Sequence, residues 1–341
     1  MLTIINQKEL ATIIQLSGQA IRDFLSTADP SQFNEEAQLA IKSFQANPAV
    51  FFDDKLVEYG SVTVDAINYP VRIEVRGKTP EGAAQMVAKG IWGAKRSEAV
   101  QYIYQQCKKL GLGIHLKLAG TSSFEFNVDG VDKAVPIRFL QHSFDAVLKE
   151  MNYQPGEYIN SRITKTIVAA DGDSTIYDGP KVGFLPSLAD SPVKDALCAY
   201  LKAGGVFMLI SGNDLNRSFK RIVDALPKDL YCRVLVAGNG GADLVYVNAE
   251  GQAIPVSGYR EQALDFVQSK PQHDLDMVYI GDDGSMNGND YPAFKAVGFD
   301  NSVLVASEFL DDYDPALKPC YVGGLLQGTR KYLERFLLDR S

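Results

Sequence analysis

The chain has 341 residues, of which 46% are hydrophobic and 22% charged, an ordinary globular composition with room for about two domains. Its formal net charge of −8 argues against nonspecific binding to nucleic acid or to an anionic membrane surface. The start of the chain lacks the apolar core of a signal peptide, and no window has the apolar length of a membrane span, so the expected location is the cytoplasm.

The first part of the chain shows a mixed α+β pattern that ends at a turn-like stretch near residues 152–157. Periodicity and turn residues predict helices at 10–25, 79–107 and 143–150, and strands at 61–67, 71–76, 114–118 and 124–128, with Asp129-Gly130 as a hairpin turn. We therefore predict a smaller α+β domain over residues 1–155. It could cover an active site as a cap, contact another subunit or bind a partner protein.

The second part of the chain alternates between apolar strand patterns and amphipathic helix patterns. Strands are predicted at 167–171, 206–210, 233–237, 243–248, 277–280 and 302–305, and helices at 191–202, 214–226, 259–268, 291–296 and 325–338. Alternation of this kind implies right-handed crossovers and a parallel sheet. We predict a Rossmann-like, doubly wound α/β domain over residues 160–341.

The most informative segment follows the first of these strands and places Asp171 and Asp173 one residue apart. Like charges this close repel each other, and a metal cation is the usual remedy. In open α/β sheets, ligands bind beyond the carboxyl ends of the strands, where this pair is expected to lie.

Two further predicted strands end in polar clusters. The first leads into Ser211, Gly212 and Asn213, and the second leads into an acidic run over residues 281–290. Between them, on a predicted helix, lies Arg260. The chain therefore offers acids, a hydroxyl and a cation in a fixed order.

This ordered set resembles the four motifs of the haloacid dehalogenase superfamily of phosphatases and phosphotransferases. Those motifs are a strand with Asp-x-Asp-x-Thr/Val, a strand with Ser or Thr, a Lys or Arg, and a strand with an acidic cluster. The first motif is matched by Asp171, Asp173 and Thr175 and is similar to that of the inosine-monophosphate-specific 5′-nucleotidases. The Gly-Asp-Asp to Gly-Asn-Asp block is similar to that of phosphomannomutases.

The resemblance implies a role for each matching residue. Asp171 would be the nucleophile that forms an aspartyl-phosphate, and Asp173 would act as general acid and then general base. Mg²⁺ would be held by the Asp171 carboxylate, the Asp173 backbone carbonyl and Asp282. The phosphoryl group would be bound by Ser211, Gly212 and Arg260. Supporting positions would be Thr175, Asp283, Asn289 and Asp290.

Some of these assignments have alternatives. Asp283 or Asp290 could orient Asp282, or the roles could shift by one position. Arg217, Lys220 and Lys270 compete with Arg260 for the third motif.

The leading hypothesis is a Mg²⁺-dependent phosphomonoesterase acting on a small phosphorylated metabolite, a sugar phosphate or a nucleotide. A phosphotransferase or phosphomutase is the second reading, and a protein-interaction module whose catalytic half acts on phosphoprotein is the third. The segment between the first and second motifs and the segment between the second and fourth motifs are both too short for a large inserted cap domain. Residues 176–188 hold at most a flap.

Overall fold

The structure is a computed structural model in which residues 29, 31, 42, 45, 57–59, 71–75, 105, 108–109, 114–119, 123–128, 131–153, 163–164, 166–179, 185–262, 276–286 and 288–339 are described. Two compact units divide the chain, Met1–Asp129 and Gly130–Ser341. We expected the boundary near residue 155. The division falls earlier because the helix that follows residue 133 packs on the sheet of the second unit.

In the first unit, the described residues form a four-stranded antiparallel sheet of order β1-β2-β4-β3. Its strands are β1 (Val57–Tyr59), β2 (Val71–Val75), β3 (Ile114–Ala119) and β4 (Ser123–Val128). Because Ala119 pairs with Ser123, residues 120–122 connect β3 to β4. The predicted hairpin turn at Asp129-Gly130 lies outside the described residues, and the next described element is a helix. The predicted strand at 61–67 and most of the predicted helices at 10–25 and 79–107 lie outside the described residues.

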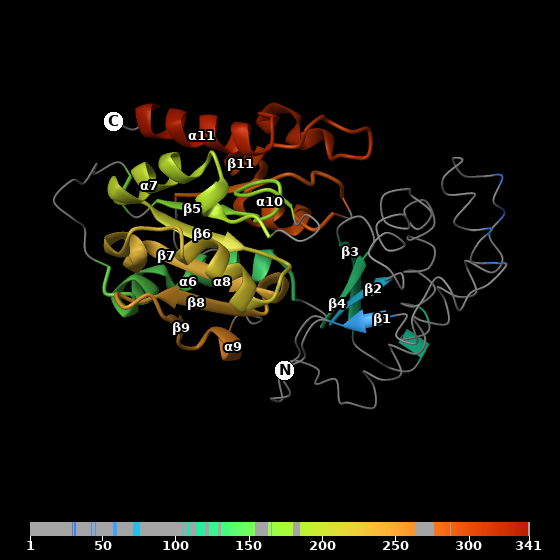
Figure 1. The fold of residues 1–341 in the computed structure, drawn as a ribbon, viewed down its shortest axis with the longest axis horizontal. Helices are drawn as coiled ribbons and strands as arrows, with labels where there is room; N and C mark the ends of the chain where they lie inside the picture. The colour runs from blue at the N-terminus through green and yellow to red at the C-terminus, as the bar shows by residue number, and fades with distance from the viewer. Residues whose placement is uncertain are drawn as a thin grey trace. The chain divides into compact units, whose positions relative to one another are not determined.

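The second unit contains a seven-stranded sheet of order β11-β10-β5-β6-β7-β8-β9 (Figure 1). Its strands are β5 (Ile167–Ala170), β6 (Val206–Ile210), β7 (Val234–Gly238), β8 (Asp243–Val247), β9 (Ala253–Pro255), β10 (Met277–Gly281) and β11 (Ser302–Leu304). The five strands from β11 to β7 are parallel, which confirms the predicted α/β fold. β8 runs antiparallel to β7, because the short connection at Asn239–Gly241 allows a hairpin but no crossover. β9 in turn pairs antiparallel with β8.

Helices cover both faces of this sheet (Figure 1). One face packs against α7 (Lys194–Lys202), α8 (Leu215–Val223) and α11 (Leu326–Asp339). The other packs against α6 (Ala134–Glu150), α10 (Tyr291–Val297) and the first residue of α9 (Tyr259–Gln262). Short 3₁₀ turns are η2 (Leu188–Asp190), η3 (Lys228–Arg233), η4 (Asn239–Gly241), η5 (Phe299–Asn301) and η6 (Pro315–Cys320). With both faces covered, the central strands are apolar throughout and fully buried.

Helix α6 is longer than the helix that we predicted at 143–150. It begins at Ala134, because Pro136 lies in the first turn, where a proline is tolerated. Its buried face includes Phe139, Phe144 and Val147, which pack in the same core as α10. In the part of the chain that the structure describes, no helix combines the length and hydropathy that a membrane crossing requires.

Candidate active site

Three carboxylates meet at the carboxyl edge of the sheet, and we call Asp171, Asp282 and Asp290 the acidic cluster. Asp171 follows β5, Asp282 follows β10, and Asp290 ends the loop between β10 and α10. Because β5 and β10 are parallel neighbours, their carboxyl ends lie at one edge. One carboxylate oxygen from each residue lies within 4.8 Å of the others. The cluster therefore offers three oxygen ligands from two segments of the chain, the end of β5 and the loop between β10 and α10.

A buried lysine is bonded to two members of the acidic cluster. Lys133 precedes α6, its side chain is 1% exposed, and its Nζ donates hydrogen bonds to Asp171 Oδ1 and, at 2.7 Å, to Asp290 Oδ1. A buried ammonium group is costly unless it is paired and hydrogen-bonded. The two carboxylates supply that pairing, so α6 delivers a fixed positive charge to the nucleophile predicted from the sequence.

Asp290 is held by donors on both of its oxygens. Tyr279 Oη donates to Oδ1 at 2.7 Å, and the backbone N–H groups of Asp282 and Asp283 donate to Oδ2 at 3.0 and 3.1 Å. Gly281 permits this arrangement, because a Cβ there would lie 2.5 Å from Asp290 Oδ2. Asp290 is thus fixed in place, and it orients the turn that carries Asp282.

The pKa shifts of these groups reflect burial first and then the neighbouring charges. Burial lowers the pKa of Lys133, but Asp171 and Asp290 outweigh it and leave that pKa above its usual value. Burial raises the pKa of Asp171 to about 7, against the opposing effect of Lys133. Burial and the neighbouring carboxylates also raise the pKa of Asp282 well above its ordinary value. One lysine therefore does not balance three acids.

A divalent cation fits this donor set. Three carboxylates paired with one lysine leave two negative charges, which a divalent cation would balance, and hard oxygen ligands are those that Mg²⁺ prefers. The two predicted ligands Asp171 and Asp282 both belong to the cluster. Asp290, which we predicted as a supporting residue, is the third member.

Asp173 lies beside the cluster and is held from two sides. Its side chain is 33% exposed, its Oδ2 accepts a hydrogen bond from Asn213 Nδ2 at 3.1 Å, and its Oδ1 lies 2.8 Å from Arg221 Nη1. Ser211, at the end of β6, accepts hydrogen bonds from the Asn213 backbone N–H and Nδ2 at 3.1 and 3.2 Å. The first and second predicted motifs are therefore connected through Asn213.

The turn after β5 is tightly closed. The backbone N–H groups of Ile176 and Tyr177 donate to the Gly172 carbonyl at 2.9 and 3.1 Å. The Tyr177 ring lies so close that a Cβ on Gly172 would be 2.5 Å from its Oη. Thr175 is fully buried, and its hydroxyl has no hydrogen-bond partner among the described residues. Its supporting role stays a prediction.

Asp283 closes the loop of the fourth motif. Its Oδ1 accepts hydrogen bonds from the Ser285 backbone N–H at 3.1 Å and from Ser285 Oγ at 2.7 Å. Its Oδ2 accepts from the Asn289 backbone N–H at 3.3 Å. Asp283 therefore shapes the loop, whereas Asp282 belongs to the acidic cluster.

The structure does not test every predicted phosphate ligand. Arg260 lies in α9, but its side chain is outside the described residues, as is all of Lys270. Gly212 is half-buried beside Ser211. Sequence reasoning did not identify Lys133 or Arg221. No local pattern distinguishes either from the other basic residues, and only the packing of α6 and α8 on the sheet brings them to the site.

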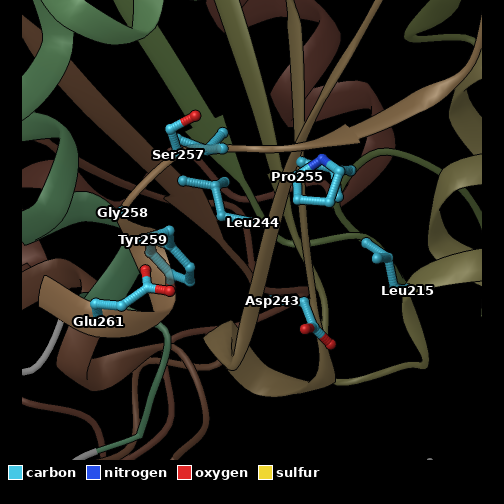
Figure 2. Close-up of a pocket in the computed structure, with 10 residues that line it drawn as sticks. Leu215, Asp243, Leu244, Pro255, Ser257, Gly258, Tyr259 and Glu261 are labelled. Carbon is cyan, nitrogen blue, oxygen red and sulfur yellow. The ribbon is translucent and has the colours of Figure 1, made fainter.

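A cavity of about 300 Å³ lies elsewhere on the second unit (Figure 2). Asp243 and Leu215 lie on one side of it, and Tyr259 and Glu261 lie on the other (Figure 2). Asp243 pairs with Gly238 at the carboxyl end of β7, so the cavity is at the same edge of the sheet as the acidic cluster. It shares no lining residue with that cluster.

No protein-family model matches the chain, and no curated protein matches it. Among solved structures, the chain is similar to an N-terminally truncated Plasmodium falciparum IMP-nucleotidase with IMP bound, at 13% identity over 36% of this chain and 38% of that one, with a TM-score of 0.23. It is also similar to a mutant of the same enzyme with IMP bound, at 12% identity over 58% of this chain and 78% of that one, with a TM-score of 0.31. The chain thus spans about two fifths of the first of these structures. With TM-scores this low the similarity carries no weight for function, which rests on the residues of the site.

Proposed function

We propose that this chain is a phosphomonoesterase of the haloacid dehalogenase type that hydrolyses a small phosphorylated metabolite with the help of Mg²⁺. The observation that carries the proposal is the convergence of Asp171, Asp282 and Asp290 around one buried lysine, with Asp173 beside them. Carboxylates brought together from separate segments are costly to bury, and such clusters with perturbed pKa values are typical of functional sites.

In the first step, the Asp171 carboxylate attacks the phosphorus atom and the bond to the leaving oxygen breaks. Lys133 bonds one oxygen of Asp171, which leaves the other oxygen free to attack. Asp173 is partly exposed and lies two residues away, so it can give a proton to the leaving oxygen. The products of this step are an alcohol and an aspartyl-phosphate at residue 171.

In the second step, Asp173 accepts a proton from water as the water attacks the phosphorus atom. The acyl-phosphate bond breaks, Asp171 regains its carboxylate, and inorganic phosphate leaves. A Mg²⁺ ion held by the acidic cluster would neutralise charge on the phosphoryl oxygens. Lys133 keeps a positive charge at the nucleophile throughout.

Replacement of Asp171 by Asn tests the proposal. The wild-type protein is incubated with a panel of sugar phosphates and nucleoside monophosphates, with Mg²⁺ or with a chelator, and released phosphate is measured. We expect Asp171→Asn to abolish release while the thermal unfolding transition persists. The exposed Asp195 on α7 gives a matched control, because Asp195→Asn should leave the rate unchanged.

Two outcomes would count against this function. Phosphate release by Asp171→Asn at the wild-type rate would exclude the aspartyl-phosphate route. Transfer of the phosphoryl group to a second metabolite without release of inorganic phosphate would favour a phosphotransferase or a phosphomutase instead.

A further inference from the structure

Arg221 is a buried arginine on α8 that contacts the predicted general acid. Its side chain is 2% exposed, and Nη1 lies 2.8 Å from Asp173 Oδ1. Neither of these two atoms makes a hydrogen bond of normal geometry within the described residues, so the contact is an ion pair. A buried guanidinium needs partners to offset the loss of hydration, and here one partner is Asp173, the general acid of the proposed reaction.

The rest of the guanidinium is fixed by backbone carbonyls. Nε donates to the Pro186 carbonyl at 2.7 Å, and Nη2 donates to the Asp178 carbonyl at 3.0 Å. The guanidinium carbon lies 3.6 Å from the centre of the Tyr177 ring, a close cation–π contact. Three directions of the planar group are therefore occupied, and Nη1 is held pointing toward Asp173.

Within the described part of the chain, the Asp173 carboxylate has two side-chain partners, Arg221 on one oxygen and Asn213 on the other. Asn213 follows β6, whereas Arg221 comes from the far end of α8. A carboxylate that must give and take a proton needs one orientation toward the reacting oxygen, since small misplacements lower rates steeply. Arg221 and Asn213 together define that orientation.

On the basis of the proposed function, we infer that Arg221 is a positioning residue that acts on the chemistry through Asp173. Its contacts among the described residues are with Asp173, two backbone carbonyls and the Tyr177 ring and include no member of the acidic cluster, so its effect must pass through the general acid. The consequence is specific: loss of Arg221 weakens proton donation to the leaving oxygen and leaves the nucleophile in place.

Leaving groups of different basicity separate this role from a structural one. p-Nitrophenolate departs without a proton, whereas benzyl alkoxide needs one, so p-nitrophenyl phosphate and benzyl phosphate form a matched pair of probes. Because kcat/KM reports only the steps up to formation of the aspartyl-phosphate, it excludes the later hydrolysis in which Asp173 acts as base for both substrates. We expect Arg221→Met to lower kcat/KM for benzyl phosphate by about 10- to 100-fold and kcat/KM for p-nitrophenyl phosphate by less than about 3-fold.

A double-mutant cycle gives the second readout. In an Asp173→Asn background, Arg221→Met should lower kcat by less than about 2-fold, because the residue it acts through is already disabled. Arg221→Lys keeps the charge and should restore part of the loss on benzyl phosphate. This variant also serves if Arg221→Met proves too unstable to assay.

Arg233 supplies a matched control, because it is also buried, donates to the Leu201 carbonyl at 2.8 Å and lies 5.5 Å from the Tyr153 ring. Arg233→Met should change both substrates by the same factor. Equal losses in kcat/KM on both substrates for Arg221→Met, or an undiminished loss in the Asp173→Asn background, would overturn the positioning role. Failure of the proposed function looks different, because wild-type protein would then hydrolyse neither substrate, or Asp171→Asn would remain active.

Discussion

Replacement of Lys133 by Met is the sharpest test of how the acidic cluster is stabilised. The substitution keeps the length and the apolar stem of the side chain but removes the charge that bonds Asp171 and Asp290. At an effective dielectric constant of 20, an ion pair at the 2.7 Å distance to Asp290 contributes about 6 kcal/mol of attraction. Desolvation of the buried ions offsets much of this attraction, so only part of it appears as stability.

We therefore expect Lys133→Met to lower the free energy of unfolding by about 3 to 5 kcal/mol, the usual loss when one partner of a buried pair is removed. For a unit of this size, the midpoint of thermal unfolding should fall by about 6 to 20 °C. Circular dichroism in the presence of a chelator measures the shift. Lys149→Met is the matched control, because Lys149 is exposed near the end of the same helix.

Mg²⁺ should restore part of the stability that Lys133→Met removes, because the ion brings positive charge to the same carboxylates. A loss below about 1 kcal/mol would match an exposed ion pair and would refute the reasoning. A Lys133→Met variant that is as destabilised as expected but insensitive to Mg²⁺ would refute the cation site alone.

Two further substitutions test the site. Millimolar Mg²⁺ should stabilise the wild-type protein by about 3 kcal/mol at a hundredfold excess over its dissociation constant, and Asp282→Asn should abolish that effect in thermal unfolding, whereas the exposed Glu308→Gln should retain it. Gly172→Ala should destabilise the protein by about 1 to 3 kcal/mol, because its Cβ would lie 2.5 Å from Tyr177 Oη. Adding Tyr177→Phe should recover part of this loss in denaturant titrations, and no recovery would show that the clash lies elsewhere.

The fold of the second unit could be predicted because its signals are local. Strands such as Val206–Ile210 are short, wholly apolar and bounded by turns, and the helices between them begin at recognisable residues such as Asp214. Because parallel strands end at a common edge, the order of polar residues after each strand predicted which acids would meet. The proximity of Asp171 and Asp282 follows from that rule.

The positive charges of the site could not be predicted in this way. Lys133 lies in front of α6, 38 residues before Asp171, in a region that we assigned to another domain. Arg221 is one of several basic residues on α8, and neighbours such as Lys220 have the same local pattern. Which of them faces the sheet depends on the rotation and packing of the helix, and a single sequence does not determine these.

The upstream position of Lys133 has a practical consequence for dividing the gene into fragments. A shortened version that began at residue 160 would keep all four predicted motifs but lack both helix α6, which covers one face of the sheet, and Lys133, the ion-pair partner of Asp171. Such a product would be expected to aggregate or to be inactive, so a lack of activity would not test the function of the full chain. Truncations intended to isolate this half should begin no later than Gly130.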